Sequence, residues 1–325
     1  MLRVLFVVRR DLETNPGADS VQVQKLHGGL QRLGVEVDIC NNGMDNLGSQ
    51  YDIVHFFNLF RARELYPAFR KLGSTAVKKI LTPLYWPLER IRMAWGPGHY
   101  RRWQAGAPLR RELVAGMDML APAAAVEAEQ VLAEYSVDVS WQVASVGTDI
   151  HRLPEEPVTL SPETVLCVGR IALWNNQLAL ARVCRQLGVK LVLAGPISDY
   201  GYSLQIRREN PAVEFTGRVD EQRLAGLYRS AALHVQPAWY AVPGLVNLDA
   251  AALGCRLIAT AEGSARAYLG DAVGYCSPDD SALLKRLVAA NLGQSAPPGL
   301  DMAVQSAWSW RHAAEITASI YKRLV

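Results

Sequence analysis

The segment from Trp239 to Thr260, WYAVPGLVNLDAAALGCRLIAT, has the residue pattern of a phosphate-binding loop. Pro243 and Gly244 lead into an alanine-rich helix, and the first backbone N–H groups of a helix have no partner within it. These groups and the helix dipole favour a phosphate without help from any side chain. Its single carboxylate, Asp249, lies inside the helix, so catalysis, anion binding and simple packing all stay open.

Two further glycines stand where a phosphate or another polar ligand could bind. Gly169 and Arg170 directly follow the apolar run VLCV, and a guanidinium there could stabilise charge on a phosphate. The alternative is a surface arginine that closes a loop. Gly17, in ETNPGADS, precedes a helix whose N-terminus could hold an anion. The alternative is simple capping by Asp19 or Ser20, and both can hold at once.

Composition places these loops on a globular protein with two domains. The chain has 325 residues, which suits two domains of about 150 residues each. Half the residues are apolar, a fifth are charged, and the net charge of +3 does not indicate a nucleic-acid-binding protein. The six histidines show no metal-ligand spacing, so we expect no built-in metal site.

The sequence shows no targeting or membrane signal. No 18-residue window is apolar and free of charge, and the N-terminal apolar run is closed by Arg9 and Arg10. The five cysteines are far apart and lie mostly in apolar segments, as in a reduced cytoplasmic protein. We therefore expect a cytoplasmic location.

The same β-α-β unit begins twice along the chain. LRVLFVV is followed by a glycine-containing loop, an amphipathic helix and VEVDIC, while TVLCVGR is followed by a loop, a helix and VKLVLAG. QRLGVEVDI and RQLGVKLVL nearly match in register. Each copy predicts the opening of a parallel, doubly wound α/β sheet.

The remaining pattern extends both sheets. Further strands are predicted at 51–57, 77–83, 117–123, 140–150, 212–217, 233–237, 256–260 and 272–277. We expect domains at 1–153 and 154–305, with a C-terminal helix in 306–325. Ligands bind beyond the carboxyl ends of such strands, which selects the loops 9–20, 57–62, 83–100, 169–176, 195–203, 217–220 and 238–246.

Five motifs carry a family resemblance. In order, they are VLCVGRIALWNNQ, KLVLAGP, VEFTGRVDEQRLAGLYRSAALHVQP, PGLVNLDAAALGCRLIAT and WSWRHAAEITASIYKRL. This order and spacing resembles retaining GT-B glycosyltransferases of family 4, the glycosyl transferases group 1. The resemblance implies two Rossmann-like sheets facing a cleft, with the C-terminal helix packing back toward the N-terminal domain.

The resemblance also implies an activity. The N-terminal domain would bind a glycan or lipid-linked acceptor, and the C-terminal domain a UDP- or GDP-linked sugar donor. The enzyme, hexosyltransferase-like, would transfer the sugar with retention and without metal or cofactor, in bacterial surface polysaccharide synthesis. It would act in the cytoplasm, with peripheral attachment to the inner face of the membrane as an option.

Donor-site residues carry over from the resemblance. Gly169 and Arg170 would meet the diphosphate, and the turn Gly217-Arg218-Val219 would lie along the nucleobase, unless it is a plain strand-to-helix turn. The phosphate loop would be Pro243, Gly244, Leu245 and Val246. Asp249 would bind the ribose, where relatives more often have glutamate. The alternative for Asp249 is an acid that favours the helix dipole from the first turn.

Three positions depart from the family pattern. Asn175 stands where relatives have lysine, and its neutral amide replaces a charged hydrogen bond worth about 1.5–3 kcal/mol with one worth about 1 kcal/mol. Ala241 stands where a glutamate contacts the sugar. Leu84, Tyr85 and Trp86 replace a histidine loop. Tyr85 could bind a sugar hydroxyl and Trp86 could stack on a sugar, or both could pack. In the first half, Asn15, Gly17 and Ala18 would form the acceptor or phosphate loop.

Residues 85–111 hold six arginines, one acid and five large aromatic side chains. Arginine pairs with phosphate, and tryptophan favours membrane interfaces. We expect a membrane or acceptor patch formed by Arg90, Arg92, Trp95, Arg101, Arg102 and Trp103. An acidic partner protein or a solvated face would also explain this composition.

The three departures leave a second functional hypothesis open. A catalytically impaired relative could keep the fold and bind nucleotide or a partner transferase, as a regulatory or scaffolding subunit. A third option is a transferase whose chemistry relies on Arg170, Arg218 and backbone amides.

Overall fold

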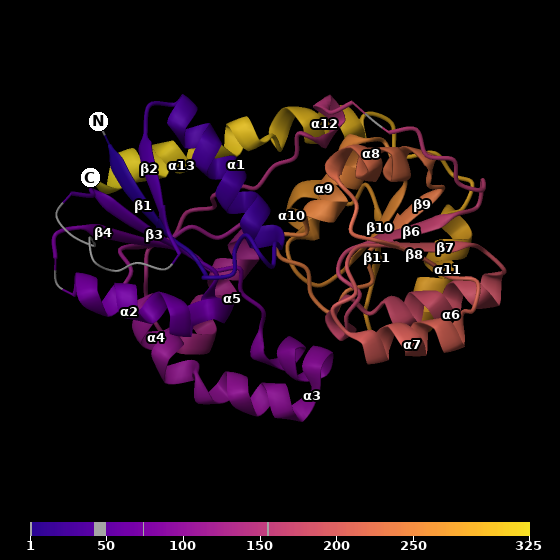
Figure 1. Ribbon diagram of the computed structural model, residues 1–325, viewed down its shortest axis with the longest axis horizontal. Helices are drawn as coiled ribbons and strands as arrows, with labels where there is room; N and C mark the ends of the chain where they lie inside the picture. The colour runs from indigo at the N-terminus through magenta and orange to yellow at the C-terminus, as the bar shows by residue number, and fades with distance from the viewer. Residues whose placement is uncertain (1, 42–49, 74, 155) are drawn as a thin grey trace. The chain divides into compact units, whose positions relative to one another are not determined.

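The computed structural model describes residues 2–41, 50–73, 75–154 and 156–325, which divide into two compact units (Figure 1). The first unit consists of Met1–Ile91, Pro97–Gly147 and Trp310–Val325. The second consists of Arg92–Gly96 and Thr148–Ser309. Each unit contains one parallel sheet, so the predicted pair of Rossmann-like sheets is confirmed.

The first unit has a five-stranded sheet in the order β2-β1-β3-β4-β5. All pairs are parallel, as expected when helices connect successive strands. Every residue of β3 is buried, including the polar His55 among its apolar neighbours, as expected for a central parallel strand. The bounds are Arg3–Val7 for β1, Glu36–Cys40 for β2, Ile53–Phe57 for β3, Lys78–Thr82 for β4 and Met119–Leu120 for β5.

The strand predicted at 140–150 is wrong. Only Trp141 makes a bridge, and its partner is Leu120. Since β5 is two residues long, it offers the next segment too little edge for a ladder. The chain instead continues irregularly to the end of the unit.

Helices cover both faces of this sheet (Figure 1). On one face α1 packs against the C-terminal α13, where a side chain at Gly29 would come within 2.6 Å of Ala314. The C-terminal helix thus belongs to the first unit, as predicted. The helices are α1 (Ala18–Arg32), α2 (Ala62–Leu72), α3 (Leu88–Ala105), α4 (Ala107–Ala115), α5 (Ala125–Tyr135) and α13 (Trp310–Leu324).

The predicted loop 83–100 is wrong from Leu88 onward, because α3 begins there. The cause is visible in the chain. Helix-forming residues surround Gly96 and Pro97, and Gly96 takes φ 76°, which allows a kink instead of an end.

A buried polar chain attaches α13 to the sheet. His55 Nδ1 lies 2.6 Å from the Tyr321 hydroxyl, and its Nε2 lies 2.9 Å from Thr82 Oγ1. Thr82 in turn donates to the carbonyl of Ala121 at 3.1 Å. Burial lowers the pKa of His55 to about 3, so the ring is neutral near pH 7. Nε2–H therefore donates to Thr82, and Nδ1 accepts from Tyr321.

We predict that Tyr321→Phe lowers the free energy of unfolding by about 1–3 kcal/mol, because the buried His55 Nδ1 loses its donor. Urea denaturation measures the change. Tyr200→Phe is the matched control, since Tyr200 is 72% exposed and should show no shift. Equal stability of both variants would contradict a role for this hydrogen bond.

The second unit has a six-stranded parallel sheet in the order β11-β10-β9-β6-β7-β8. All six strands occur where the sequence predicts them. Their bounds are Val165–Val168 for β6, Leu191–Ala194 for β7, Glu214–Gly217 for β8, Leu233–Val235 for β9, Leu257–Thr260 for β10 and Gly274–Cys276 for β11.

Alternating side chains of this sheet pack against helices on its two faces. Leu233 and Val235 join the core formed with α6, α7 and α11, while His234 between them packs edge-on against Tyr228 of α8. The helices are α6 (Gln177–Leu187), α7 (Tyr200–Glu209), α8 (Glu221–Ser230), α9 (Leu245–Ala252), α10 (Ala265–Leu269), α11 (Ser281–Asn291) and α12 (Leu300–Ala307).

Candidate functional site

Three glycines end three neighbouring strands of the second unit. Gly169 follows β6, Gly195 follows β7 and Gly217 closes β8. Gly169 donates to the carbonyl of Ala194 and Gly195 to that of Gly217, each at 2.9 Å. A Cβ on Gly195 would lie 2.1 Å from the Gly169 carbonyl oxygen. Only glycine therefore allows this approach, which keeps the edge of the sheet free of side chains.

Sequence reasoning selected Gly169 and Gly217 but missed Gly195. The signal was present, because each of three consecutive predicted strands of this half ends in glycine. All three have positive φ values, at 142°, 148° and 70°, which other residues rarely adopt.

The turn after β6 is held by two side-chain amides. Asn175 Nδ2 and Gln177 Nε2 each donate to the Arg170 carbonyl at 2.7 Å. Arg170 Nη1 lies 3.5 Å from Ser198 Oγ, which belongs to the loop after β7. Asn175 thus shapes the turn with the amide that was expected to reach a phosphate. Gln177 is a second support that the sequence did not reveal.

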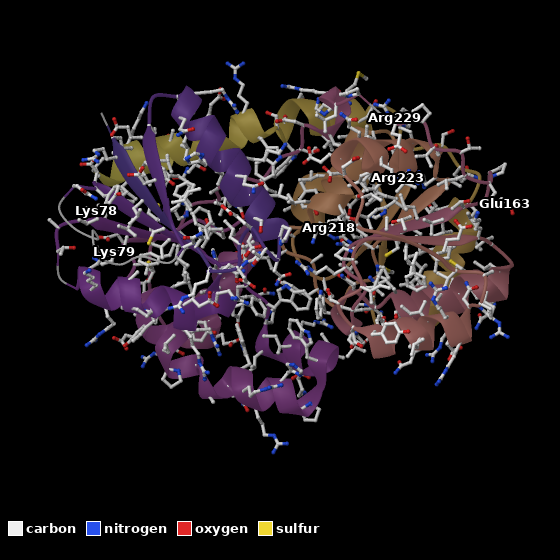
Figure 2. The ribbon with its side chains drawn as sticks, in the orientation of Figure 1. Lys78, Lys79, Glu163, Arg218, Arg223 and Arg229 are labelled. Carbon is white, nitrogen blue, oxygen red and sulfur yellow. The ribbon has the colours of Figure 1, made fainter. Side chains whose placement is uncertain are left out.

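Arg218 and Val219 follow Gly217 at the same edge of the sheet. Arg218 is exposed and, among the residues that the structure describes, makes no hydrogen bond or ion pair. Figure 2 labels Arg218, Arg223 and Arg229, which occur in that order from the loop along α8. Arg223 differs because it pairs with Glu156 at 2.7 Å. Arg218 therefore presents a guanidinium at the carboxyl edge.

The loop before α9 is fixed by a second set of contacts. Ser264 Oγ donates to the Pro243 carbonyl at 3.1 Å, and the Tyr268 hydroxyl donates to the Gly244 carbonyl at 3.0 Å. Gly244 has φ 69°, and a Cβ there would lie 2.5 Å from the Tyr268 oxygen. Glycine is therefore required both by conformation and by space.

This loop presents backbone donors. Gly244 is the N-cap of α9, and the carbonyl of Gly244 accepts from Asn247 at 3.0 Å. The N–H groups of Leu245 and Val246 in the first turn have no partner among the described residues. Such groups at a helix N-terminus are suited to an anion.

Ala241 is part of the framework of this loop. Its N–H donates to the Glu262 carbonyl at 3.1 Å, and its carbonyl accepts from Ser264 at 3.0 Å. The residue is only 5% exposed. The position where a carboxylate was expected therefore holds a buried methyl group.

Asp249 is the fifth residue of α9, so it is outside the first turn and the helix-dipole interpretation is wrong. Its Oδ1 accepts from Thr148 Oγ1 at 2.5 Å, and the Thr148 N–H donates to the Trp308 carbonyl at 2.8 Å. Asp249 thus connects α9 to the turn at 147–150. Ribose binding by Asp249 stays a prediction.

In the first unit, the loop 9–20 is organised around a buried arginine. Arg9 is 5% exposed, and its Nε lies 2.6 Å from Asp19 Oδ2. Its Nη2 also donates to the Asn15 carbonyl at 2.8 Å. Burial alone would raise the pKa of Asp19, but hydrogen bonds from Arg9 and Asn58 hold that pKa below its usual value.

Capping of α1 by Ser20 is confirmed, since the Gly17 N–H donates to Ser20 Oγ at 3.0 Å. The helix begins at Ala18, and its first turn already contains the Asp19 carboxylate. Asp19 accepts the Ser20 N–H at 2.9 Å, so this first-turn donor is already used. The acceptor or phosphate role predicted for Asn15, Gly17 and Ala18 stays a prediction.

Tyr85, predicted as a catalytic residue that could bind a sugar hydroxyl, packs inside the first unit, and its catalytic role stays a prediction. The side chain is completely buried, and its hydroxyl donates to Glu134. Burial raises the pKa of this phenol far above its usual value. Trp86 also packs against a neighbour. Its ring lies edge-on to that of Phe60, with 6.2 Å between the two ring centroids.

The basic segment is more buried than expected. Trp103 is 9% exposed, and the Arg110 guanidinium lies 3.5 Å from its ring centroid, so Trp103 is no surface anchor. The arginines that are exposed are Arg92, Arg101 and Arg102, while Arg90 is half-buried. In the second unit, the Trp95 ring lies 5.5 Å from that of Trp174.

Among the described residues, no group of three or more histidine, cysteine or acidic side chains is placed to hold a metal ion. In the same part of the chain, no helix is both long and apolar enough to cross a membrane.

Residues 162–290 match the family described as glycosyl transferases group 1. The match covers the three glycine turns, the loop before α9 and α9 itself. It indicates glycosyl transfer as the class of activity. No curated protein sequence matches the chain.

Solved structures confirm the GT-B fold of this chain. Sucrose-phosphate synthase from Thermosynechococcus elongatus is 16% identical with a TM-score of 0.82, covering 100% of this chain and 99% of that one. AviGT4, a glycosyltransferase involved in avilamycin A biosynthesis, is 18% identical with a TM-score of 0.65, covering 100% and 98%. Anabaena HepE, in complex with UDP and glucose, is 13% identical with a TM-score of 0.76, covering 99% and 100%.

We predict that Gly195→Ala lowers the free energy of unfolding by about 1–3 kcal/mol, because the new methyl group forces β6 and β7 apart. Denaturant titration measures the loss. Gly201→Ala in α7 is the control, because the nearest atom to its Cβ lies at 3.5 Å. The control should be neutral or more stable by about 0.4–1 kcal/mol. A tolerated Gly195→Ala would contradict the close approach.

Proposed function

We propose that the protein is a retaining glycosyltransferase. It moves a sugar from a UDP- or GDP-linked donor to a glycan or lipid-linked acceptor in bacterial surface polysaccharide synthesis. The donor site is the carboxyl edge of the sheet in the second unit. The observation that carries this proposal is the glycine edge, where three strand ends meet without intervening side chains, together with the backbone donors at the N-terminus of α9.

The charges at this edge fit a nucleotide diphosphate. Arg170 follows β6 and Arg218 follows β8, while the Leu245 and Val246 N–H groups supply neutral donors. Asp249 lies one turn further along α9, and in this proposal its carboxylate accepts a hydrogen bond from a ribose hydroxyl. The UDP and glucose bound to HepE support the same class of donor for this chain.

The proposed reaction exchanges one bond at the anomeric carbon. The bond to the donor phosphate oxygen breaks as the bond to the acceptor oxygen forms, and the acceptor hydroxyl proton passes to the leaving diphosphate. Arg170 and the α9 amides stabilise the negative charge that grows on that diphosphate. In this proposal they take the place of a metal ion, and Asn175 contributes by shaping the Arg170 turn.

The exposed arginines of α3 support an anionic acceptor or surface. Arg101 and Arg102 are exposed on the part of α3 that belongs to the first unit, which suits peripheral binding to the inner face of the membrane. The first unit contributes to acceptor binding in this proposal, and nucleic acid has no role.

We predict that UDP or GDP binds the wild-type protein and that Arg218→Gln weakens this binding about 10–100-fold, the loss of one charged hydrogen bond. Calorimetric titration gives both affinities. Arg223→Gln is the control, because its partner is Glu156. An unchanged affinity in Arg218→Gln removes this arginine from the site, and a wild-type protein that binds neither nucleotide overturns the proposed function.

A second candidate function rests on Ala241 and Asn175. The buried methyl of Ala241 cannot bind a sugar hydroxyl, and Asn175 uses its amide on the Arg170 carbonyl. A protein with these features could bind the nucleotide without turnover and regulate a partner transferase.

Donor hydrolysis in the presence of EDTA separates the two functions. For an enzyme, we predict UDP or GDP release by the wild-type protein and a loss of about 10²–10³-fold in Arg170→Gln, because one charge-stabilising donor is removed. Arg182→Gln, which breaks only an exposed pair with Glu209, should keep full activity. Nucleotide binding without turnover, unchanged in Ala241→Glu and Asn175→Lys, would favour the regulatory function.

A further inference from the structure

The second unit exposes apolar side chains beside the proposed donor loop. We define an apolar patch as Met93, Trp95, Leu173, Trp174 and Ile197. Met93, Leu173 and Ile197 are 39%, 42% and 43% exposed. Single exposed apolar residues are common, but several together usually mark a binding surface.

Named contacts hold these residues together. The rings of Trp95 and Trp174 lie 5.5 Å apart at 51°, which joins residues 92–96 to the loop after β6. Ile171 in that loop donates to Pro196 at 2.9 Å and accepts from Ser198 at 3.1 Å, which brings in the loop that carries Ile197.

The patch borders the charged part of the donor site. Arg170 immediately precedes Ile171, and its guanidinium lies 3.5 Å from the hydroxyl of Ser198, the neighbour of Ile197. At the other side, the exposed Arg92 directly precedes Met93. A ligand on the patch would therefore have hydrocarbon under one part and a cation within reach of another.

We propose that the patch binds the hydrocarbon chain of an amphipathic acceptor with a phosphate or diphosphate headgroup. The proposal rests on the proposed function and selects the lipid-linked acceptor over a free glycan. A free glycan needs convergent polar groups, whereas methionine, leucine and isoleucine offer none. A protein partner fits poorly, since a stable interface takes about 20–30 residues a side.

Arg92 and Arg170 would bind different ligands in this proposal. Arg170 holds the donor diphosphate, so the acceptor headgroup pairs with Arg92. This arrangement brings the acceptor to the donor edge with its chain lying over Trp95 and Trp174.

Calorimetry with two probes tests this. Farnesyl diphosphate carries headgroup and chain, and inorganic diphosphate carries the headgroup alone. Titrations run with and without saturating UDP, below the micelle concentration. We expect farnesyl diphosphate to bind at least about tenfold more tightly than inorganic diphosphate, the effect of burying roughly one or two apolar side chains.

The double variant Met93→Gln/Leu173→Gln should weaken farnesyl diphosphate binding about tenfold and leave inorganic diphosphate and UDP binding unchanged. Met302→Gln is the control, since Met302 is 67% exposed on α12, outside the patch. Unchanged UDP affinity and melting temperature show that the double variant is folded. If that variant loses its fold, Leu173→Gln alone, at an exposed position, gives the same comparison.

Equal affinity for the two probes, or equal binding by wild type and variant, would overturn the proposal. So would flotation of the protein on phosphatidylglycerol vesicles that depends on the patch without any binding of farnesyl diphosphate, because the bilayer would then be the ligand. Binding of farnesyl diphosphate without any binding of UDP or GDP would support the patch while the proposed donor function fails.

Discussion

The close contact between the ends of β6 and β7 is the constraint on which the donor edge depends. The Gly169 carbonyl occupies the space that any side chain at Gly195 would need. Hydrogen bonds from Gly169 to Ala194 and from Gly195 to Gly217 then align three strand ends. Because no side chain separates them, the residues that follow, Arg170 and Arg218 among them, can serve one ligand.

Around this edge, the chain uses side chains to position backbone and uses backbone to offer donors. Asn175 and Gln177 hold the Arg170 carbonyl, while Ser264 and Tyr268 hold the carbonyls before α9. Catalysis by such a site depends on donors that are already oriented before charge develops. In the proposed donor site, asparagine at 175 and alanine at 241 would therefore alter what contacts the sugar, while the supports of the proposed phosphate loop stay in place.

The sequence predicts the fold better than the site because local pattern sets strands and helices, while burial sets the role of a side chain. The strands from β6 to β11 follow from apolar runs bounded by glycine and proline. Tyr85 shows the limit. Its position after β4 indicates a ligand-binding residue. Within the first unit, however, its hydroxyl donates a hydrogen bond to Glu134, which is far away in the sequence. Asp249 is similar, since only the fold brings Thr148 to its carboxylate.

Two glycine-led helix N-termini illustrate why the phosphate role falls to the second unit. Helix α1 begins after Gly17 and α9 after Gly244, so both have a backbone suited to an anion. The first turn of α1 contains Asp19, whose carboxylate accepts the Ser20 N–H, so one donor of this turn is already used. The first turn of α9 contains no acid, and its carboxylate lies at the fifth position instead. The difference between the two helices is one acidic residue moved by three positions, and it favours α9 as the diphosphate site in the proposed function.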